Sequence, residues 1–497
     1  IGIGNGLLHT DNAYIADLSL GGFSNSGLVN NGLVTVGNLS GALGSLSGSG
    51  TTQVMAASTP FMTSGLLIKT SHTLEFYGQY GGVYGGSFGP RLEPNARLIN
   101  YGTLDGASVM LQGTANSSNL PRFINRGTLT GGLNSNGVRV DNEGSVTLGD
   151  GWPMFFGPAG VHSGSFLAGL DSVLTFGGPW GHELLTGSSL NSAGKVRFVD
   201  GVHKVGGSYS AQETHLLHEG NHNSYLTFTG PLAHMPKLRV DAGSGQLRFK
   251  TPAAVSIGEL TLDSGSVLFD VAPGSNPRPT STVQTLTLNG GIFNSDGYGA
   301  ASTPVNVVDP LVWNAGSIGG TAAVTAMGGI EINATTALDR SLYGQLRNAG
   351  TANWHGGVIH WGGTFENLAG ATFNLNGDFS TGSGGFGRFI NKGTFRKTAG
   401  SGVATLGMAF DNNGLVEAQA GTLRLNGGGT HDGGRFETLP GALIELAGGT
   451  VLKGAVITSG RVDITGGNLT LLTGASFINA VGNSVNVTDM NLSLIHI

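Results

Sequence analysis

The sequence contains no cysteine, and this absence removes three kinds of chemistry together. Across 497 residues, the lack of cysteine excludes disulfide bonds, cysteine-ligated zinc and thiol nucleophiles. The fold must therefore depend on burial and hydrogen bonding, and any reactive group has to come from another residue type.

Charged residues are also scarce. They make up 11% of the chain, against a typical share of about 25%, and the net charge is -6. The 24 lysines and arginines form no basic stripe, so we expect no nucleic-acid partner. No hydrophobic run approaches the roughly 18 consecutive residues that a membrane-spanning helix needs. We therefore expect no transmembrane helix.

Glycine is abundant where charge is rare. Its 89 residues are about two and a half times the usual share of roughly 7%, and they recur every few positions. Hydrophobic residues still make up 39% of the chain and occur in short alternating runs, which excludes intrinsic disorder. Frequent glycine also excludes long helices, so we expect short strands separated by tight turns.

One short unit recurs along the chain. The segment RFINRGTLTGGLNSNGVRVDNEGSV (122–146) aligns with RFINKGTFRKTAGSGVATLGMAFDNNGLV (388–416), and each holds two copies of the form apolar-x-Asn-x-Gly-small-apolar. Related units occur at 97–104, 345–354 and 364–373. A loose period of 17 to 25 residues with strand-like alternation is typical of a β-solenoid. The motif asparagines form two arrays, Asn100, Asn125 and Asn142 in the first and Asn348, Asn367, Asn391 and Asn412 in the second.

The asparagine and glycine of each unit predict a corner of the coil. Asparagine tolerates the left-handed backbone conformation, and glycine accepts a positive φ without steric cost. If successive coils place the asparagines one above another, their side-chain amides can form a hydrogen-bonded ladder. Phe123 and Leu129, like Phe389 and Phe395, then supply apolar side chains to the interior. We therefore expect the seven motif asparagines to be structural corner residues.

Several segments are similar to the repeats of a known group of proteins. ANWHGGVIHWGGTFENLAGATFNLNGD (352–378) and GLVEAQAGTLRLNGGGT (414–430), with the Asn-x-Gly-Thr units, resemble repeats of large secreted or surface-exposed bacterial proteins. Autotransporter passengers and filamentous adhesins belong to this group. The resemblance covers most of positions 23–480 and implies a right-handed parallel β-helix in a secreted or cell-surface protein. It implies a structural or adhesive scaffold that presents loops or flanking domains to glycans or surface proteins, without a cofactor.

These observations together predict an all-β chain, a single-stranded, elongated, right-handed parallel β-helix. We expect one continuous solenoid over 1–491, with regular asparagine arrays at 97–148 and 345–417 and less regular turns at 150–340. The final residues, LSLIHI (492–497), look like a translated sequencing adapter and are expected to be a non-native tail.

A polysaccharide-active β-helix enzyme, a lyase or a glycoside hydrolase, is the alternative function. Glycoside hydrolysis needs at least a pair of carboxylates, and no aspartate in the sequence is adjacent to another. Carboxylates of successive turns can still meet in space. A cleft lined by three or more of them, with basic groups, would favour the enzyme.

The segment HEGNH (218–222) satisfies the H-E-x-x-H zinc motif. In that motif His218 and His222 would be the ligands and Glu219 the general base. The mechanism requires both histidines on one face of a helix, and the intervening glycine and asparagine are poor helix formers. We therefore favour a polar turn, and a helix over 210–222 is the condition for a zinc site.

Two tryptophans are candidates for carbohydrate binding. Trp354 and Trp361 lie in NWHGGVIHWGG (353–363), and exposed tryptophan rings can stack on sugars. Both also fall at repeat-equivalent apolar positions, which favours the alternative that they fill the coil interior.

Overall fold

The chain folds into strands and turns. The computed structural model describes residues 1–21, 26–40, 44–55, 66–80, 90–113, 119–232, 234–272, 276–296, 302–333, 339–381, 386–479, 484–488 and 491–494. These residues form 57 strands and no helix. It follows that no helical segment in this part of the chain has the length and apolarity needed to cross a membrane.

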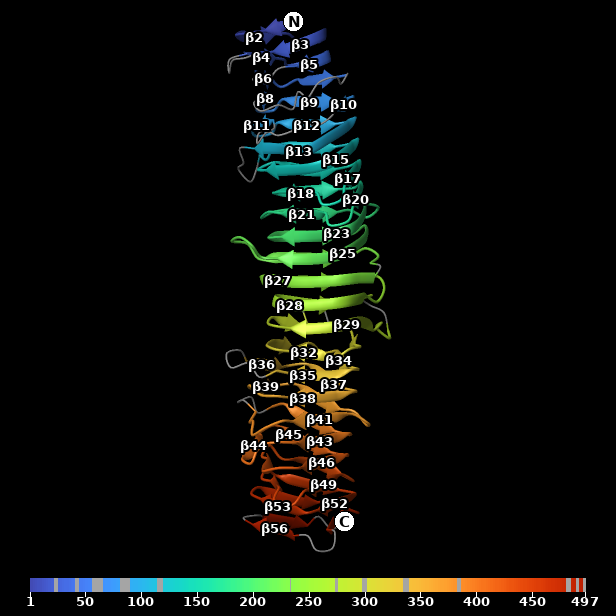
Figure 1. Ribbon diagram of the computed structural model, residues 1–497, viewed down its shortest axis with the longest axis vertical. Coiled ribbons are helices and arrows are strands. Elements are labelled where there is room, and N and C mark those ends of the chain that lie inside the picture. The colour runs from blue at the N-terminus through green and yellow to red at the C-terminus, as the bar shows by residue number, and fades with distance from the viewer. Residues whose placement is uncertain are drawn as a thin grey trace. The chain divides into compact units, whose positions relative to one another are not determined.

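The strands are divided between two compact units. Unit 1 is Ile1–Lys237 with Asp241–Gly245, and unit 2 is Leu238–Val240 with Gln246–Ile497. Within each unit, short parallel strands lie one above another in successive turns (Figure 1). The two units together contain about 20 turns. The predicted fold class, an all-β parallel solenoid, is confirmed.

Each regular turn contributes three short strands to three parallel faces. In unit 1 the first face contains β14 (Arg122–Asn125), β16 (Arg139–Asn142), β19 (Ala159–His162), β22 (Gly181–Leu184) and β24 (Gly201–Val205). The second contains β15 (Thr128–Asn136), β17 (Ser145–Leu148) and β20 (Ser165–Ala168). The third contains β18 (Pro153–Phe156) and β21 (Val173–Gly177). In unit 2 the first face contains β37 (Gln345–Asn348), β40 (Thr364–Asn367), β42 (Arg388–Asn391), β45 (Ala409–Asn412) and β48 (Gly429–Asp432).

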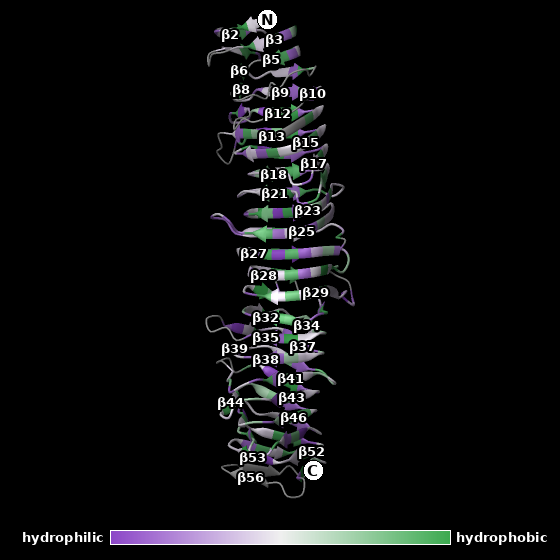
Figure 2. Ribbon diagram, in the orientation of Figure 1, coloured by the Kyte–Doolittle hydropathy of each residue, from purple (hydrophilic) through white to green (hydrophobic). Residues whose placement is uncertain are grey.

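Alternating hydrophobicity makes these segments strands. Successive Cβ atoms of a strand point to opposite faces, so every second residue enters the interior. In β18 the residues alternate between exposed and buried positions. Figure 2 shows the same alternation as bands of opposite hydropathy along β23 (Ser189–Val199). The interior is therefore filled by residues two positions apart.

Aromatic rings stack in columns inside unit 2. Phe389 lies 4.9 Å from Phe365 and 5.0 Å from Phe410, measured between ring centroids. Phe373 and Phe395 stack beside them at 5.2 Å. Burial of each such side chain contributes roughly 1.5 to 3 kcal/mol. The interior position expected for Phe389 and Phe395 is found, since neither has exposed surface.

The motif asparagines form two hydrogen-bonded ladders. They lie at the ends of the first-face strands, and all seven side chains are fully buried. In five of them Nδ2 donates to Oδ1 of the asparagine one turn further on, at 2.8 to 2.9 Å, and in the last of each array, Asn142 and Asn412, Nδ2 donates to a backbone oxygen. The same Nδ2 groups donate to backbone oxygens, as Asn391 does to Leu415 at 3.0 Å. The first ladder is Asn100–Asn125–Asn142, and the second is Asn348–Asn367–Asn391–Asn412.

Strand pairing reaches the end of the described chain. β57 (Asn491–Leu494) pairs in parallel with β54 (Asn468–Leu471), so the first residues of the predicted adapter-like tail take strand conformation. The remainder of that tail, 495–497, lies outside the described residues.

We expect replacement of Asn391 by alanine to lower the stability of unit 2 by about 2 to 4 kcal/mol. The substitution removes the acceptor of one N–H of Asn367 and the donor to the backbone oxygen of Leu415, and it removes one of the two donors to Oδ1 of Asn412. A buried polar group that loses its partner costs roughly 1 to 3 kcal/mol. The measurement is urea unfolding followed by far-UV circular dichroism. Asn413→Ala, at an exposed position of the next turn, is the control and should change stability by less than about 0.5 kcal/mol. Equal effects of the two substitutions would show that the ladder does not stabilise the coil.

Candidate functional site

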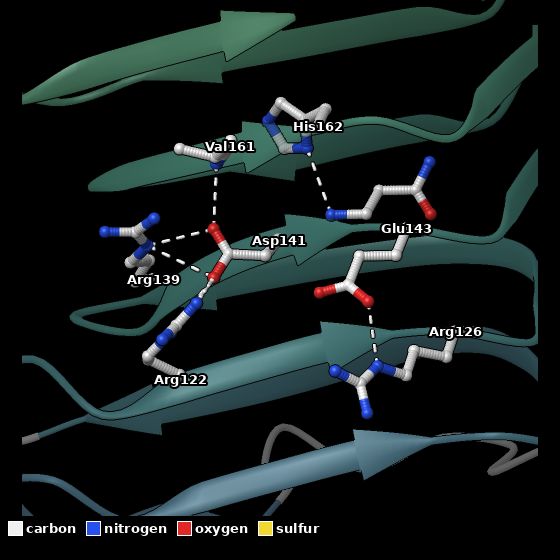
Figure 3. Close-up of polar contacts among 8 residues, drawn as sticks. Arg122, Arg126, Arg139, Asp141, Glu143, Val161 and His162 are labelled. Atoms are coloured by element: carbon white, nitrogen blue, oxygen red, sulfur yellow. Dashed lines mark hydrogen bonds and ion pairs between the residues drawn. The ribbon is translucent and has the colours of Figure 1, made fainter. Parts of the chain in front are cut away.

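A buried carboxylate organises a polar cluster on the first face of unit 1. Asp141 in β16 accepts hydrogen bonds from Nε of Arg122 at 3.0 Å and from Nε of Arg139 at 2.9 Å (Figure 3). The backbone N–H of Val161, one turn further on, donates at 2.8 Å to Oδ1 of Asp141, the oxygen that Arg139 also contacts at 2.9 Å. A carboxylate this deeply buried requires such partners. The two guanidinium groups are thereby held over Asp141.

Arg122 and Arg139 belong to a column of three arginines. In register, Arg97 of β12 (Arg97–Asn100) pairs with Arg122, and Arg122 pairs with Arg139. Equivalent positions of neighbouring parallel strands lie about 4.8 Å apart. Arg97 is exposed and has no ion-pair partner in the described part of the chain. We call Arg97, Arg122 and Arg139 the arginine column.

A shallow groove of about 400 Å³ adjoins the arginine column. Glycines form part of its floor: a Cβ at Gly160 would lie 2.1 Å from the backbone oxygen of Val140, and one at Gly181 would lie 1.8 Å from that of Val202. No other residue fits there without displacing backbone. Trp180, 45% exposed, lines the groove. The lining residues are Arg139, Ala159, Gly160, Val161, Trp180, Gly181, His182, Glu183, Val202 and Lys204.

Beneath the groove, the asparagine ladder continues as a column of buried histidines. The backbone N–H of Asn142 donates to Nδ1 of His162, so this ring carries its proton on Nε2, which lies 3.0 Å from Nδ1 of His182. His182 in turn directs Nε2 at the backbone oxygen of Gly177, and its backbone N–H donates to Nδ1 of His203. In each ring Nδ1 accepts a hydrogen bond and Nε2 faces an acceptor, so each ring is the neutral Nε2–H tautomer. The column therefore has no place for an extra proton.

Burial lowers the pKa of each histidine in this column. It lowers the pKa of His162 to about 3 and that of His203 to about 4. The pKa of His182 also lies well below its usual value, because of burial and of its two histidine neighbours. The charged groups facing the column are Asp141, Arg139 and Asp200, which partly offset one another and do not reverse the shift. All three rings are neutral at neutral pH.

Unit 2 contains an equivalent cluster that lacks one arginine. Arg388 pairs with Asp411, and the backbone N–H of Thr430 donates to Asp411 at 2.9 Å. A buried histidine, His431, follows the asparagine ladder there as well. The position of Arg139 is taken by Ala409. The carboxylate is thus a shared structural device, and the second arginine is specific to unit 1.

Trp354 and Trp361, the carbohydrate candidates from the sequence, both lie inside unit 2. Trp354 is 0% and Trp361 2% exposed, and Nε1 of Trp354 donates to the backbone oxygen of Gly356 at 3.0 Å. The structure therefore corresponds to the alternative in which the rings fill the coil. Neither presents a face on which a sugar can stack.

The HEGNH segment is a non-helical turn. It follows β25 (Ser208–Leu217), and Nδ1 of His218 lies 2.9 Å from the backbone oxygen of His222. Glu219 forms an ion pair with Arg197. The helix that the zinc motif requires is absent, so the two histidines do not share a helix face. Within the described ranges, no group of three or more His, Cys, Asp or Glu residues is placed to hold a metal ion.

Sequence reasoning missed most of the residues of this site. The arginine column was detectable, because RLIN, RFIN and RVDN each begin with arginine at the motif spacing. His162 and His431 occur 20 and 19 residues after the last asparagine of their arrays, which matches the repeat length. The sequence pattern does not identify Trp180, because this residue lies in a turn between β21 and β22. A third ladder, Asn289–Asn314–Asn333, was also overlooked.

Comparison of the chain with models of protein families, with curated proteins and with solved structures finds no match. The function is therefore inferred from the geometry of the chain itself.

We expect the stability of unit 1 to fall as the pH is lowered from about 6.5 towards 4. The folded pKa of each column histidine lies below the unfolded value of about 6.5, so the unfolded state binds more protons in this window. Stability is complete above about pH 6.5 and declines by about 1.4 kcal/mol per pH unit for each histidine. Urea unfolding at several pH values measures the slope.

His203→Asn should reduce this slope by about one histidine's share, about 1.4 kcal/mol per pH unit, because asparagine does not titrate. His222→Gln, in the exposed turn, is the control and should leave the slope unchanged. A slope that stays the same in His203→Asn would show that the buried column does not cause the acid sensitivity.

Proposed function

We propose that the chain is a structural and adhesive scaffold of an exported bacterial surface protein, which presents binding groups on a stable solenoid. The observation that supports this most directly is that opposite charges pair between neighbouring turns along the faces of the solenoid. Carboxylates of one turn pair in register with arginine or lysine of the next, so their charges stabilise the stack. Such in-register pairs are Glu183–Lys204, Lys195–Glu213, Arg347–Glu366, Arg396–Glu417 and Arg424–Glu445.

The grooves on the surface also support a binding role over catalysis. Three of them contain no more than one carboxylate each in their lining: the groove at Trp180, one at Arg91 and one at Pro440. A glycosidase needs two facing carboxylates, one of them with a raised pKa. None of these three grooves provides that pair.

Of the carboxylates that the structure describes, three have shifted pKa values, Glu213, Asp296 and Asp378, and all three values are lowered. Burial would raise the pKa of Glu213, but hydrogen bonds from His215 and Lys195 outweigh it and lower the value. Hydrogen bonds from Lys397 and from the backbone of Gly402 lower the pKa of Asp378. Both groups are therefore ionised at neutral pH and unsuited to act as general acids.

We expect the purified chain, coupled to beads, to attach to a surface glycan or cell without altering the glycan. Attachment is measured on arrays of neutral and acidic glycans and on cultured cells, with beads carrying the urea-unfolded chain as control. The same polysaccharides are assayed for new reducing ends and for unsaturated products. Attachment without either product supports the proposal. Release of product would replace it with the polysaccharide-active enzyme, and a chain that attaches to nothing would overturn the adhesive role.

A further inference from the structure

We propose that the arginine column and the groove at Trp180 form a binding site for a carboxylated oligosaccharide. The inference rests on the proposed adhesive function and gives that function a ligand class and named residues. The guanidinium groups would hold the carboxylates of the sugar chain, and Trp180 would hold the face of one ring.

The arginine column presents positive charge because its own carboxylate is hidden. The side chain of Asp141 is 3% exposed, whereas those of Arg122 and Arg139 are 37% and 33% exposed. Arg139 contacts Asp141 only through Nε, and its two Nη groups are directed away from the carboxylate (Figure 3). Paired N–H groups of this kind match the two oxygens of a carboxylate. Donors suited to an anion are therefore available at the surface.

The local charge has the sign that an acidic ligand requires, although the whole chain is acidic. One further carboxylate on a neighbouring strand, Glu75, already accepts hydrogen bonds from Gln53 and from the hydroxyl of Tyr77. Because both donors are uncharged, the carboxylate keeps its charge, and the column, the groove and Glu75 together contain one more cationic side chain than carboxylates. These groups are Arg97, Arg122, Arg139 and Lys204 against Glu75, Asp141 and Glu183.

Trp180 indicates that the anion is carried by a sugar. Its half-exposed ring borders a groove with a glycine floor, and aromatic rings offer a flat apolar surface to the C–H face of a sugar. A simple anion would not use the ring, and a neutral sugar would not use the arginines. The arginines recur once per turn, about 4.8 Å apart, which suits a chain with carboxylates on successive units.

A single-stranded nucleic acid also combines negative charge with stacking bases, but the site is short for one. Such ligands need a positive groove that follows the backbone over several nucleotides. The arginine column ends at Thr73 on one side, and Ala159, Gly181 and Val202 follow Arg139 on the other. We therefore infer a sugar ligand.

Unit 2 shows that loss of Arg139 is compatible with the fold. There the equivalent pair, Arg388 and Asp411, is formed with Ala409 in place of a second arginine. Arg139→Ala therefore reproduces an arrangement that the same chain already adopts, and Arg122 and Val161 still satisfy Asp141. A change in binding can be separated from unfolding.

The test is isothermal titration of the full chain with short oligomers of mannuronic acid. Arg139→Ala and Trp180→Ala should each weaken binding by at least about tenfold, the effect of losing a charge-assisted hydrogen bond or a stacking surface. Arg424→Ala, which removes an ordinary surface arginine, and Trp152→Ala, which removes a tryptophan of similar exposure outside the groove lining, are the matched controls. Both should bind as the unaltered chain does. Far-UV circular dichroism verifies folding of all four.

Matched ligands test each half of the proposed site. Methyl-esterified mannuronate oligomers, which keep the rings and lose the charge, and polyglutamate, which keeps the charge and lacks the rings, should both bind more weakly. Equal binding of polyglutamate, or tighter binding of oligothymidylate, would overturn the assignment to a sugar. Unchanged binding by Arg139→Ala and Trp180→Ala, or no binding of mannuronate by the unaltered chain, would overturn the site. Attachment of the chain-coated beads to glycans or cells would still stand in that case, so the two proposals fail separately.

Discussion

The structure depends on parallel, in-register hydrogen bonding between one turn and the next. Because the strands of successive turns run in the same direction, a residue lies beside its counterpart in the neighbouring turns at a spacing of about 4.8 Å. Every side chain must then be compatible with its equivalents above and below. Repetition of the sequence is therefore a physical requirement of this backbone, and the near-identical segments at 122–146 and 388–416 meet the same requirement twice.

The same constraint explains how a chain with few charges can hold polar groups in its interior. An isolated buried amide would cost free energy, whereas a stacked asparagine both donates to and accepts from its neighbours. Asn125, between Asn100 and Asn142, shows this arrangement. A ladder must also end somewhere. Among the described residues, Oδ1 of Asn100 has no hydrogen-bond partner, and the register partner of Asn100 in the preceding turn is Phe76. At the opposite end a histidine ring accepts from the backbone of Asn142 and continues the polar column.

The fold could be predicted from the sequence because a solenoid repeats the same short residue pattern in successive turns. Asn391 and Asn412 recur at the repeat length, which was enough to predict the stacking. The expected corner conformation was wrong, because neither these asparagines nor Gly393 and Gly414 have a positive φ; glycine is required because a Cβ at Gly414 would lie 2.1 Å from the backbone oxygen of Gly393. The site was harder to predict because it is made by register across turns and by side-chain direction. The arginines of the column occupy one position of the repeat, yet only the pairing shows that Arg122 and Arg139 share Asp141. Trp361 and Trp180 illustrate the other difficulty: both are tryptophans near glycine, and only packing decides that one is buried and the other exposed.

The two copies of the repeat separate what the fold requires from what a site can add. Both keep the buried aspartate, its first arginine, the backbone N–H from the next turn and the histidine that follows. These shared groups satisfy one another and leave no charge unbalanced. Only unit 1 adds Arg139, so one carboxylate there serves two guanidinium groups. Because the shared set already makes the corner stable, an outward residue can change without loss of the coil. A solenoid can acquire a binding surface in this way, one outward position at a time.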